Sequence, residues 1–193
     1  MSVRIGLWIV LWVALPIPGW AQTPAFAATP QTSDGPAANE PDLLLAAEDW
    51  QALAAGSGSD RICYVTRVAR ARSVLSQRDV RPLLYVTHRP SRQSYDVVAF
   101  AASYAFRADS MARVSLGGGP SYRLFTDGTF AWAGDKAIDR RIVRAMAEGG
   151  SITVTGLGAD GLLRDDNFGL SGFATAFQRA SSECRRPGAP IKR

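Results

Sequence analysis

The stretch that most constrains the fold runs from Arg81 to Phe106 and contains two apolar runs on either side of a polar turn. The runs are residues 83–87 and 97–104, and the turn is His88-Arg89-Pro90-Ser91. Both alternating faces of each run are apolar. A strand that is covered on both sides has such a continuous apolar run, whereas a strand covered on one side alternates. We therefore predict a hairpin near the centre of a small β-rich domain.

Short apolar and β-branched runs on both sides of this hairpin predict further strands. These runs occupy residues 62–68, 111–116, 121–125, 129–132, 151–155 and 162–168. Asp127-Gly128 favours a two-residue turn between two of them. Helical spacing predicts one helix from an Asp135 N-cap through Ala147 and a second helix that starts at Ser171. The chain is therefore expected to form a mainly β domain with two added α-helices.

The N-terminus has the pattern of a cleaved Sec-type signal peptide over residues 1–21. Arg4 supplies a positive charge, and the apolar segment 5–16 that follows is shorter than the roughly 20 residues that span a bilayer. Cleavage is expected after Ala21, and a second suitable site precedes Ala28. We therefore expect a periplasmic or exported protein that has no transmembrane segment in its mature form.

Composition divides the rest of the chain into three parts. Residues 22–46 are rich in small and polar residues and in proline, and are expected to form a disordered linker. Within them, Leu43-Leu44-Leu45 is compatible with either a short helical turn or a docking strand. Residues 47–185 are predicted to form the folded domain, and residues 186–193 a basic tail.

The two cysteines, Cys63 and Cys184, lie near the two ends of the predicted domain. An exported chain with an even number of cysteines is expected to have them oxidised. Their bridge would close a loop of roughly 120 residues and contribute about 4–5 kcal/mol through chain entropy. The alternative, a metal-binding or catalytic pair, has less support, because neither cysteine lies in a CxxC motif and the only histidine is His88.

Positive charge is concentrated in one part of the chain. The net charge is +5, and residues 60–92 contain eight arginines against Asp60 and Asp79. A solvated arginine-rich surface is the favoured explanation of such a cluster, and the alternative is a face that binds anionic lipid or acidic glycan. We expect no nucleic-acid partner. The eight residues are Arg61, Arg67, Arg70, Arg72, Arg78, Arg81, Arg89 and Arg92.

Several short patterns resemble functional sites but are better explained by structure. Residues 156–161 match GxGxxG, yet a strand rather than a helix is predicted after them, so a hairpin loop is expected. His88 has no second ligand nearby in the sequence, and Asp165 and Asp166 lack the spacing of a calcium loop, so we expect solvated turn acids there. No catalytic, cofactor-binding or metal-binding residue is predicted. Four aromatic residues are expected in the core: Trp50, Trp132, Phe173 and Phe177.

An ordered series of short segments extends from Glu48 to Cys184. The segments are Glu48-Asp49-Trp50, Cys63-Tyr64, Val86-Thr87-His88-Arg89-Pro90, Tyr104-Ala105-Phe106-Arg107, Tyr122-Arg123-Leu124-Phe125-Thr126, Ala131-Trp132-Ala133, Asp139-Arg140, Gly169-Leu170-Ser171-Gly172-Phe173 and Cys184. In this order and spacing they resemble the invasion-associated locus B family of exported bacterial proteins. The chain departs from the family at Ser103-Tyr104-Ala105-Phe106, where the family often has Gly-Tyr-Pro-Phe.

The resemblance implies an immunoglobulin-like β-sandwich with two added helices, an envelope or exported location and, for the founding members, a part in bacterial entry into host cells. It brings no catalytic residues. We therefore expect a non-enzymatic envelope or interaction protein, with no cofactor and with an unidentified protein or envelope component as partner. The alternatives are an exported enzyme with a dispersed site and a binder of anionic lipid or glycan through the arginine cluster.

Overall fold

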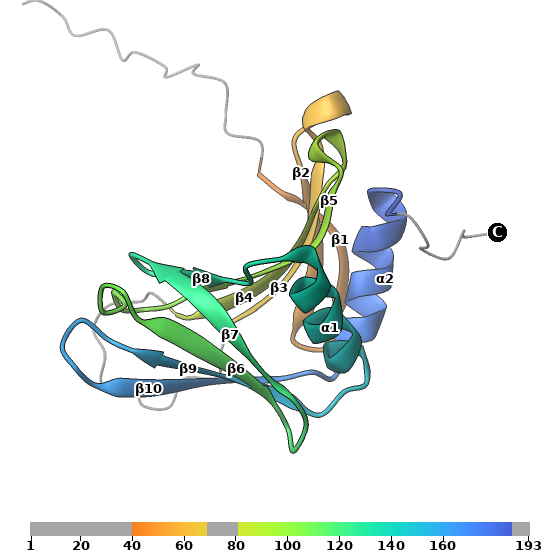
Figure 1. Cartoon of the computed structure of the whole chain (residues 1–193). Coiled ribbons are helices and arrows are strands. Elements are labelled where there is room, and N and C mark those ends of the chain that lie inside the picture. The colour runs from red at the N-terminus through yellow and green to blue at the C-terminus, as the bar shows by residue number, and fades with distance from the viewer. Residues whose placement is uncertain (1–39, 69–80, 187–193) are drawn as a thin grey trace, which may run out of the picture. The chain divides into compact units, whose positions relative to one another are not determined.

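The computed structural model describes residues 40–68 and 81–186 of the 193-residue chain. They form one antiparallel sheet of ten strands with two α-helices (Figure 1). The strands are β1 (Asp42–Ala47), β2 (Trp50–Ala55), β3 (Ile62–Val68), β4 (Leu83–Arg89), β5 (Ser94–Ala101), β6 (Met111–Leu116), β7 (Ser121–Asp127), β8 (Phe130–Trp132), β9 (Ser151–Leu157) and β10 (Leu163–Gly169). The helices are α1 (Lys136–Ala147) and α2 (Phe173–Glu183), and two 3-10 turns are η1 (Gly58–Asp60) and η2 (Pro90–Arg92).

The strand order in the sheet is β1-β2-β3-β4-β5-β8-β7-β6-β9-β10. The short strand β8 joins the two halves, because it pairs with the end of β5, where Phe100 lies opposite Ala131. Figure 1 shows the sheet bent, with β6–β10 turned across the lower part of β1–β5. Phe100 on β5 meets Phe168 on β10 with ring centroids 6.1 Å apart, so the inner faces of the two halves share one core.

The mainly β fold with two helices is confirmed, but the immunoglobulin-like β-sandwich is not. A sandwich has two separate sheets packed face to face. Here the pairing of β5 with β8 connects all ten described strands into a single sheet. That pairing covers three residues only, and nothing in the apolar pattern of β8 distinguishes it from a strand at a sheet edge.

The predicted central hairpin is confirmed as β4 and β5. Its inner face carries Leu84, Val86, Val98 and Phe100, all fully buried. The outer face, which includes Tyr85, is only half-buried. Both faces of the hairpin are therefore apolar, but only the inner one is in the core.

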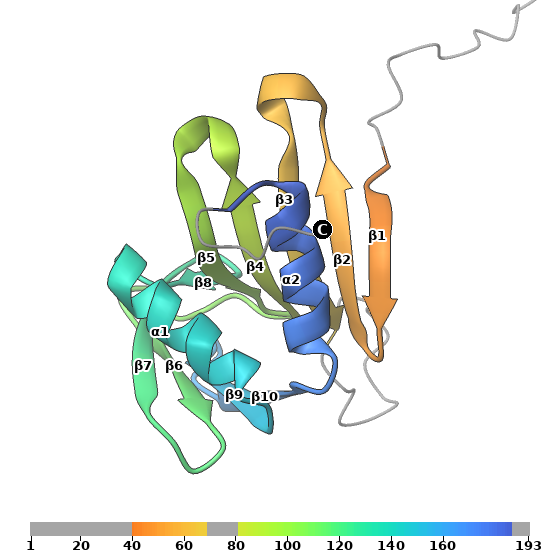
Figure 2. The same ribbon diagram turned by 90° about the vertical axis from the view of Figure 1, so that its right-hand side faces the viewer.

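Both helices lie on the same side of β1–β5 (Figure 2). α2 packs on β1, β2 and β3, and α1 packs on β5. The Asp135 cap is confirmed, because its carboxylate accepts the backbone N–H groups of Ala137 and Ile138 at 2.7 and 2.9 Å. Ile142 and Met146 bury the inner face of α1, as the helical period predicts.

The folded domain begins earlier than predicted. Residues 42–46, placed in the linker by composition, belong to β1, which pairs with β2 along its length. The strand alternative for Leu43-Leu44-Leu45 is therefore correct, and β2, which the sequence did not predict, provides its partner. The signal peptide, linker residues 22–39 and tail residues 187–193 lie outside the described residues.

The bent sheet is held closed at the carbonyl group of Gly169, the last residue of β10. The indole Nε1 of Trp50 on β2 donates to this oxygen at 3.0 Å, and Nη1 of Arg67 on β3 donates to it at 2.6 Å. Gly172 then approaches the turn after β1 so closely that a Cβ atom there would lie 2.2 Å from the oxygen of Ala47. Glycine is therefore favoured at position 172 for two reasons, the lack of space for a Cβ atom and the positive φ of +84°.

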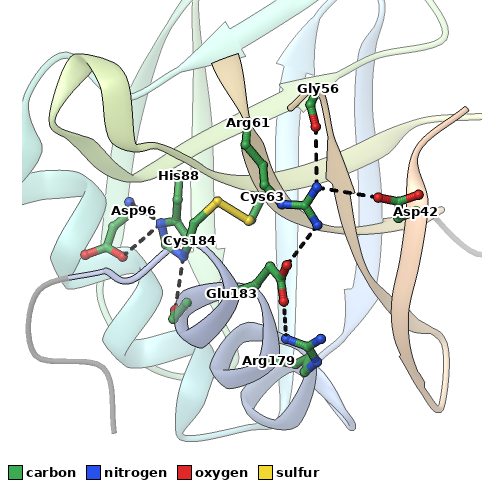
Figure 3. Close-up of a disulfide and its surroundings, with 10 residues drawn as sticks. Asp42, Gly56, Arg61, Cys63, His88, Asp96, Arg179, Glu183 and Cys184 are labelled. Carbon is green, nitrogen blue, oxygen red and sulfur yellow. Dashed lines mark hydrogen bonds and ion pairs between the residues drawn. A yellow bond between two sulfur atoms is a disulfide. The ribbon is translucent and has the colours of Figure 1, made fainter. Parts of the chain in front are cut away.

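The predicted disulfide is confirmed between Cys63 on β3 and Cys184 at the end of α2 (Figure 3). The two Cα atoms are 5.9 Å apart, and 121 positions separate the residues in sequence. Both cysteines are buried. The bond therefore fixes the C-terminal end of α2 to the inner face of the sheet.

Replacing both cysteines, Cys63→Ser and Cys184→Ser, should lower the free energy of unfolding by up to about 4–5 kcal/mol, because the unfolded chain loses a long closed loop. Denaturant titration of the oxidised protein and the double variant measures this difference. Equal unfolding midpoints would show that the bond does not stabilise the fold.

Candidate functional site

Titratable and hydroxyl side chains gather where the end of α2 meets the start of β5, beside the disulfide (Figure 3). His88 lies on β4, Asp96 on β5 and Ser181 on α2, and all three are buried. Arg186, just beyond α2, makes two hydrogen bonds to the Asp96 carboxylate, at 2.5 and 2.6 Å. A serine, a histidine and an aspartate thus meet, as they do in hydrolase triads.

A β-bulge places these groups. The pairing of β4 with β5 shifts register between Thr87 and Arg89, so His88 faces two residues of β5. Asp96 has a φ of +63°, a left-handed conformation in which aspartate is enriched. Its backbone N–H donates to His88 Nδ1 at 3.1 Å, so the bulge aims a backbone donor at the imidazole.

This contact determines which nitrogen carries the imidazole proton. Because Nδ1 accepts the Asp96 N–H, the neutral ring has its proton on Nε2. Nε2 lies 3.0 Å from Ser181 Oγ and therefore donates to it. A triad needs the opposite arrangement, in which Nε2 accepts the serine proton and Nδ1–H donates to a carboxylate. The nearest Asp96 oxygen is 3.8 Å from Nδ1.

The surroundings keep His88 neutral. Burial lowers the pKa of His88 from its ordinary value of 6.5 to about 4; Asp96 opposes this shift and Arg186 adds to it. The imidazole also contacts the Phe177 ring, with centroids 5.3 Å apart. His88 thus has a structural role, joining β4, β5 and α2, as expected for a lone histidine.

Two arginines of the predicted cluster form internal contacts. Arg61 pairs with Glu183 on α2 at 2.8 Å and with Asp42 on β1 at 3.5 Å (Figure 3). Arg67 is only 3% exposed and binds Asp49 as well as Gly169. Arg61 and Arg67 thus connect β3 to α2, β1 and β10 and do not belong to an open basic face.

The other arginines of the cluster are divided. Arg89 and Arg92 are exposed at the β4–β5 turn. Arg81 is exposed just before β4, so about seven residues of strand, roughly 20 Å, separate it from Arg89. Arg70, Arg72 and Arg78 lie outside the described residues. The described arginines therefore leave one exposed pair at the β4–β5 turn rather than a continuous face.

Two buried acids were not predicted, Asp96 and Asp139. Asp139 on α1 is 5% exposed and accepts the backbone N–H of Val98 at 2.9 Å. Burial raises its pKa to about 6; the Val98 N–H opposes the shift, and Asp96 and Asp135 add to it. Its helical spacing to Ile142 and Met146 was the available signal, because these positions share one face.

The remaining patterns have structural explanations. Residues 156–161 lie in the β9–β10 hairpin, which confirms the loop interpretation of GxGxxG. Asp165 and Asp166 lie on β10 rather than in a turn, and Asp165 accepts the Thr155 hydroxyl at 2.6 Å. Across the described ranges, no group of three His, Cys, Asp or Glu side chains is arranged to hold a metal ion.

Trp132 was expected in the core but is 38% exposed on the outer face of β8. Its neighbour Ala131 points inward instead. The error follows from the short length of β8, where three residues do not show which face is buried. Trp50 and Phe173 are buried, with ring centroids 4.9 Å apart, and Phe177 packs against the core.

Comparison with known proteins finds a relative in fold. The crystal structure of invasion associated protein b from Bartonella henselae matches with a TM-score of 0.53 and 16% sequence identity, over 75% of this chain and 100% of that chain. No protein-family model matches this sequence, and no curated protein does. At this identity the likeness concerns the fold alone. None of the described helices is long and apolar enough to cross a membrane.

As the pH falls, His88 and Asp139 should change the free energy of unfolding in opposite directions. The pKa of His88 is lowered to about 4, so its contribution is present above pH 6.5 and is lost as the pH falls toward 4. The pKa of Asp139 is raised to about 6, so its contribution is lost as the pH rises from 3.8 through 6. Each effect is about 3 kcal/mol, at 1.36 kcal/mol per pKa unit.

We therefore expect Asp139→Asn to make the protein more acid-sensitive. Between pH 6.5 and 4 the variant should lose about 3 kcal/mol more unfolding free energy than the wild type, because only the His88 effect remains. Denaturant titrations across this range measure the difference, with the exposed Asp109→Asn as control. If the unfolding free energy of Asp139→Asn fell with pH in parallel with that of the wild type, the result would contradict this prediction.

Proposed function

We propose that this protein is an exported, non-enzymatic envelope protein that acts by binding other molecules. The observation that carries the proposal is the likeness in fold to invasion associated protein b, which extends over the whole of that chain. The buried disulfide supports an oxidising compartment, since such bonds are rare in the cytosol. The name of that protein suggests a part in host-cell invasion, which belongs to the proposal, as does a function in the envelope.

The arrangement around His88 supports the non-enzymatic part of the proposal. Ser181 Oγ accepts a hydrogen bond from His88 Nε2–H and does not donate one to it, and both side chains are buried. A nucleophilic serine needs an adjacent base and access to substrate.

Fractionation of a producing bacterium tests the proposed location. The protein should be recovered from the envelope or periplasmic fraction with Cys63 linked to Cys184, starting near Gln22 or Ala28. Intact mass and peptide mapping without reduction measure both features. Full-length protein with two alkylatable thiols in the cytoplasm would contradict export.

The same purified protein tests the absence of serine hydrolase chemistry. A fluorophosphonate probe should leave Ser181 unlabelled, because no base activates it. Labelling at Ser181 that disappears in His88→Gln would favour the enzyme alternative.

The exposed pair Arg89 and Arg92 supports a second candidate function, binding of anionic lipid or glycan. Replacing both with serine should reduce retention on phosphatidylglycerol vesicles or heparin, most strongly at low salt, because exposed charges are screened over about 8–10 Å at physiological ionic strength. The unfolding free energy should change by about 0.5 kcal/mol or less. The matched control is Arg140→Ser with Arg144→Ser, which removes the same charge from exposed positions of α1. If both double variants were retained equally, Arg89 and Arg92 would be solvated surface residues without a role in binding.

A further inference from the structure

An open groove of about 560 Å³ lies between strand β7 and helix α1. Its apolar lining includes Met111, Phe125 and Ile138, and its basic lining is Arg123 and Arg141. Met111 is 41% exposed and Phe125 is 51% exposed, so both contribute large apolar surfaces outside the core. The groove is open to solvent, so it is suited to an extended chain lying along it and not to a small molecule that must be enclosed.

One side of the groove is a strand edge that no described strand covers. β6 pairs with residues 121–125 of β7, whereas β8 pairs only with residues 125–127. In an antiparallel strand, alternate residues direct their N–H and C=O groups to opposite sides. Every second residue of 121–124 therefore presents backbone donors and acceptors toward the groove. Such an edge can accept an extended peptide as an additional strand.

The charges in the groove favour an acidic occupant. Within the described part of the chain, neither Arg123 nor Arg141 makes a hydrogen bond or an ion pair. The acid in the lining is Asp135, whose pKa is lowered mainly by the two backbone N–H groups that its carboxylate accepts and also by the nearby Arg141. With two guanidinium groups against one carboxylate, the lining keeps a net positive charge, which favours carboxylates of a ligand that can form charge-assisted hydrogen bonds.

The shape of the groove depends on Gly134. A Cβ atom at this position would lie 2.4 Å from Cε2 of Phe125, so the ring rests directly against the glycine. Because Phe125 is half exposed, its ring can move if a side chain is added there. Gly134→Ala should thus reshape the groove and leave the core in place.

We propose that this groove binds an extended segment of a partner protein in which every second residue, on the face of the sheet that Arg123 and Phe125 share, is in turn acidic and apolar. The segment adds to the free edge of β7, its apolar side chains contact Met111, Phe125 and Ile138, and its carboxylates pair with Arg123 and Arg141.

Fluorescence polarisation with the labelled Glu–Val peptide Glu-Thr-Val-Thr-Glu-Thr-Val-Thr, which presents Glu and Val on one face of an added strand, tests this assignment. The peptide should bind saturably, and a Lys–Val peptide of the same length should not. Replacing Arg123 and Arg141 with serine should weaken binding roughly tenfold, since each exposed ion pair contributes up to about 1 kcal/mol. Gly134→Ala should weaken binding as well, while Arg140→Ser with Arg144→Ser should leave it nearly unchanged.

A second experiment tests whether the peptide forms backbone hydrogen bonds with the edge of β7. The Glu–Val peptide with alternate amides N-methylated cannot complete a strand ladder and should bind much more weakly than its parent. Binding of the parent should slow hydrogen exchange at residues 121–124.

Absence of saturable binding at millimolar Glu–Val peptide would overturn the proposal, as would equal binding of the methylated peptide or of the Lys–Val peptide. A dimer in sedimentation that protects the same amides would assign the edge to a second copy. Vesicle binding lost in Phe125→Ser, without peptide binding, would assign the groove to a membrane.

Discussion

The carbonyl oxygen of Gly169 is the point on which the rest of this fold depends. A carbonyl oxygen has two lone pairs, and here one is used by the Trp50 indole and the other by the Arg67 guanidinium. Those donors come from β2 and β3, near one end of the strand order, and Gly169 ends β10 at the other. This shared acceptor keeps a ten-stranded sheet bent around one core, and it sets the position from which α2 starts.

Elements whose signals are local were predictable from the sequence. β3 and β6 show a strand period between clear breaks, and α1 has both its capping aspartate and its apolar face within a single segment. The pairing of Cys63 with Cys184 followed from their number and the predicted compartment. In each case the residues that determine the structure lie within a few positions of one another, or leave no other pairing.

Features that depend on distant segments were not predictable. His88, Asp96 and Ser181 come from three separate elements, and a bulge that no residue pattern marks brings them together. Arg61 and Arg67 look like surface charges in the sequence, but their partners lie on β1, α2 and β10 or in the β1–β2 turn. The joining of the two halves of the sheet through β8 was also not predictable, because a three-residue strand has too short a pattern to show which strand it pairs with.

The position of the disulfide also determines when it can act. Cys184 follows all ten strands in sequence, whereas Cys63 belongs to the third. During synthesis, the Cys63 thiol therefore has no partner until the last strand and most of α2 have emerged. The bond cannot guide early strand pairing, and instead secures a sheet whose topology is already complete. Formation of the bond between Cys63 and Cys184 therefore reports that folding is complete.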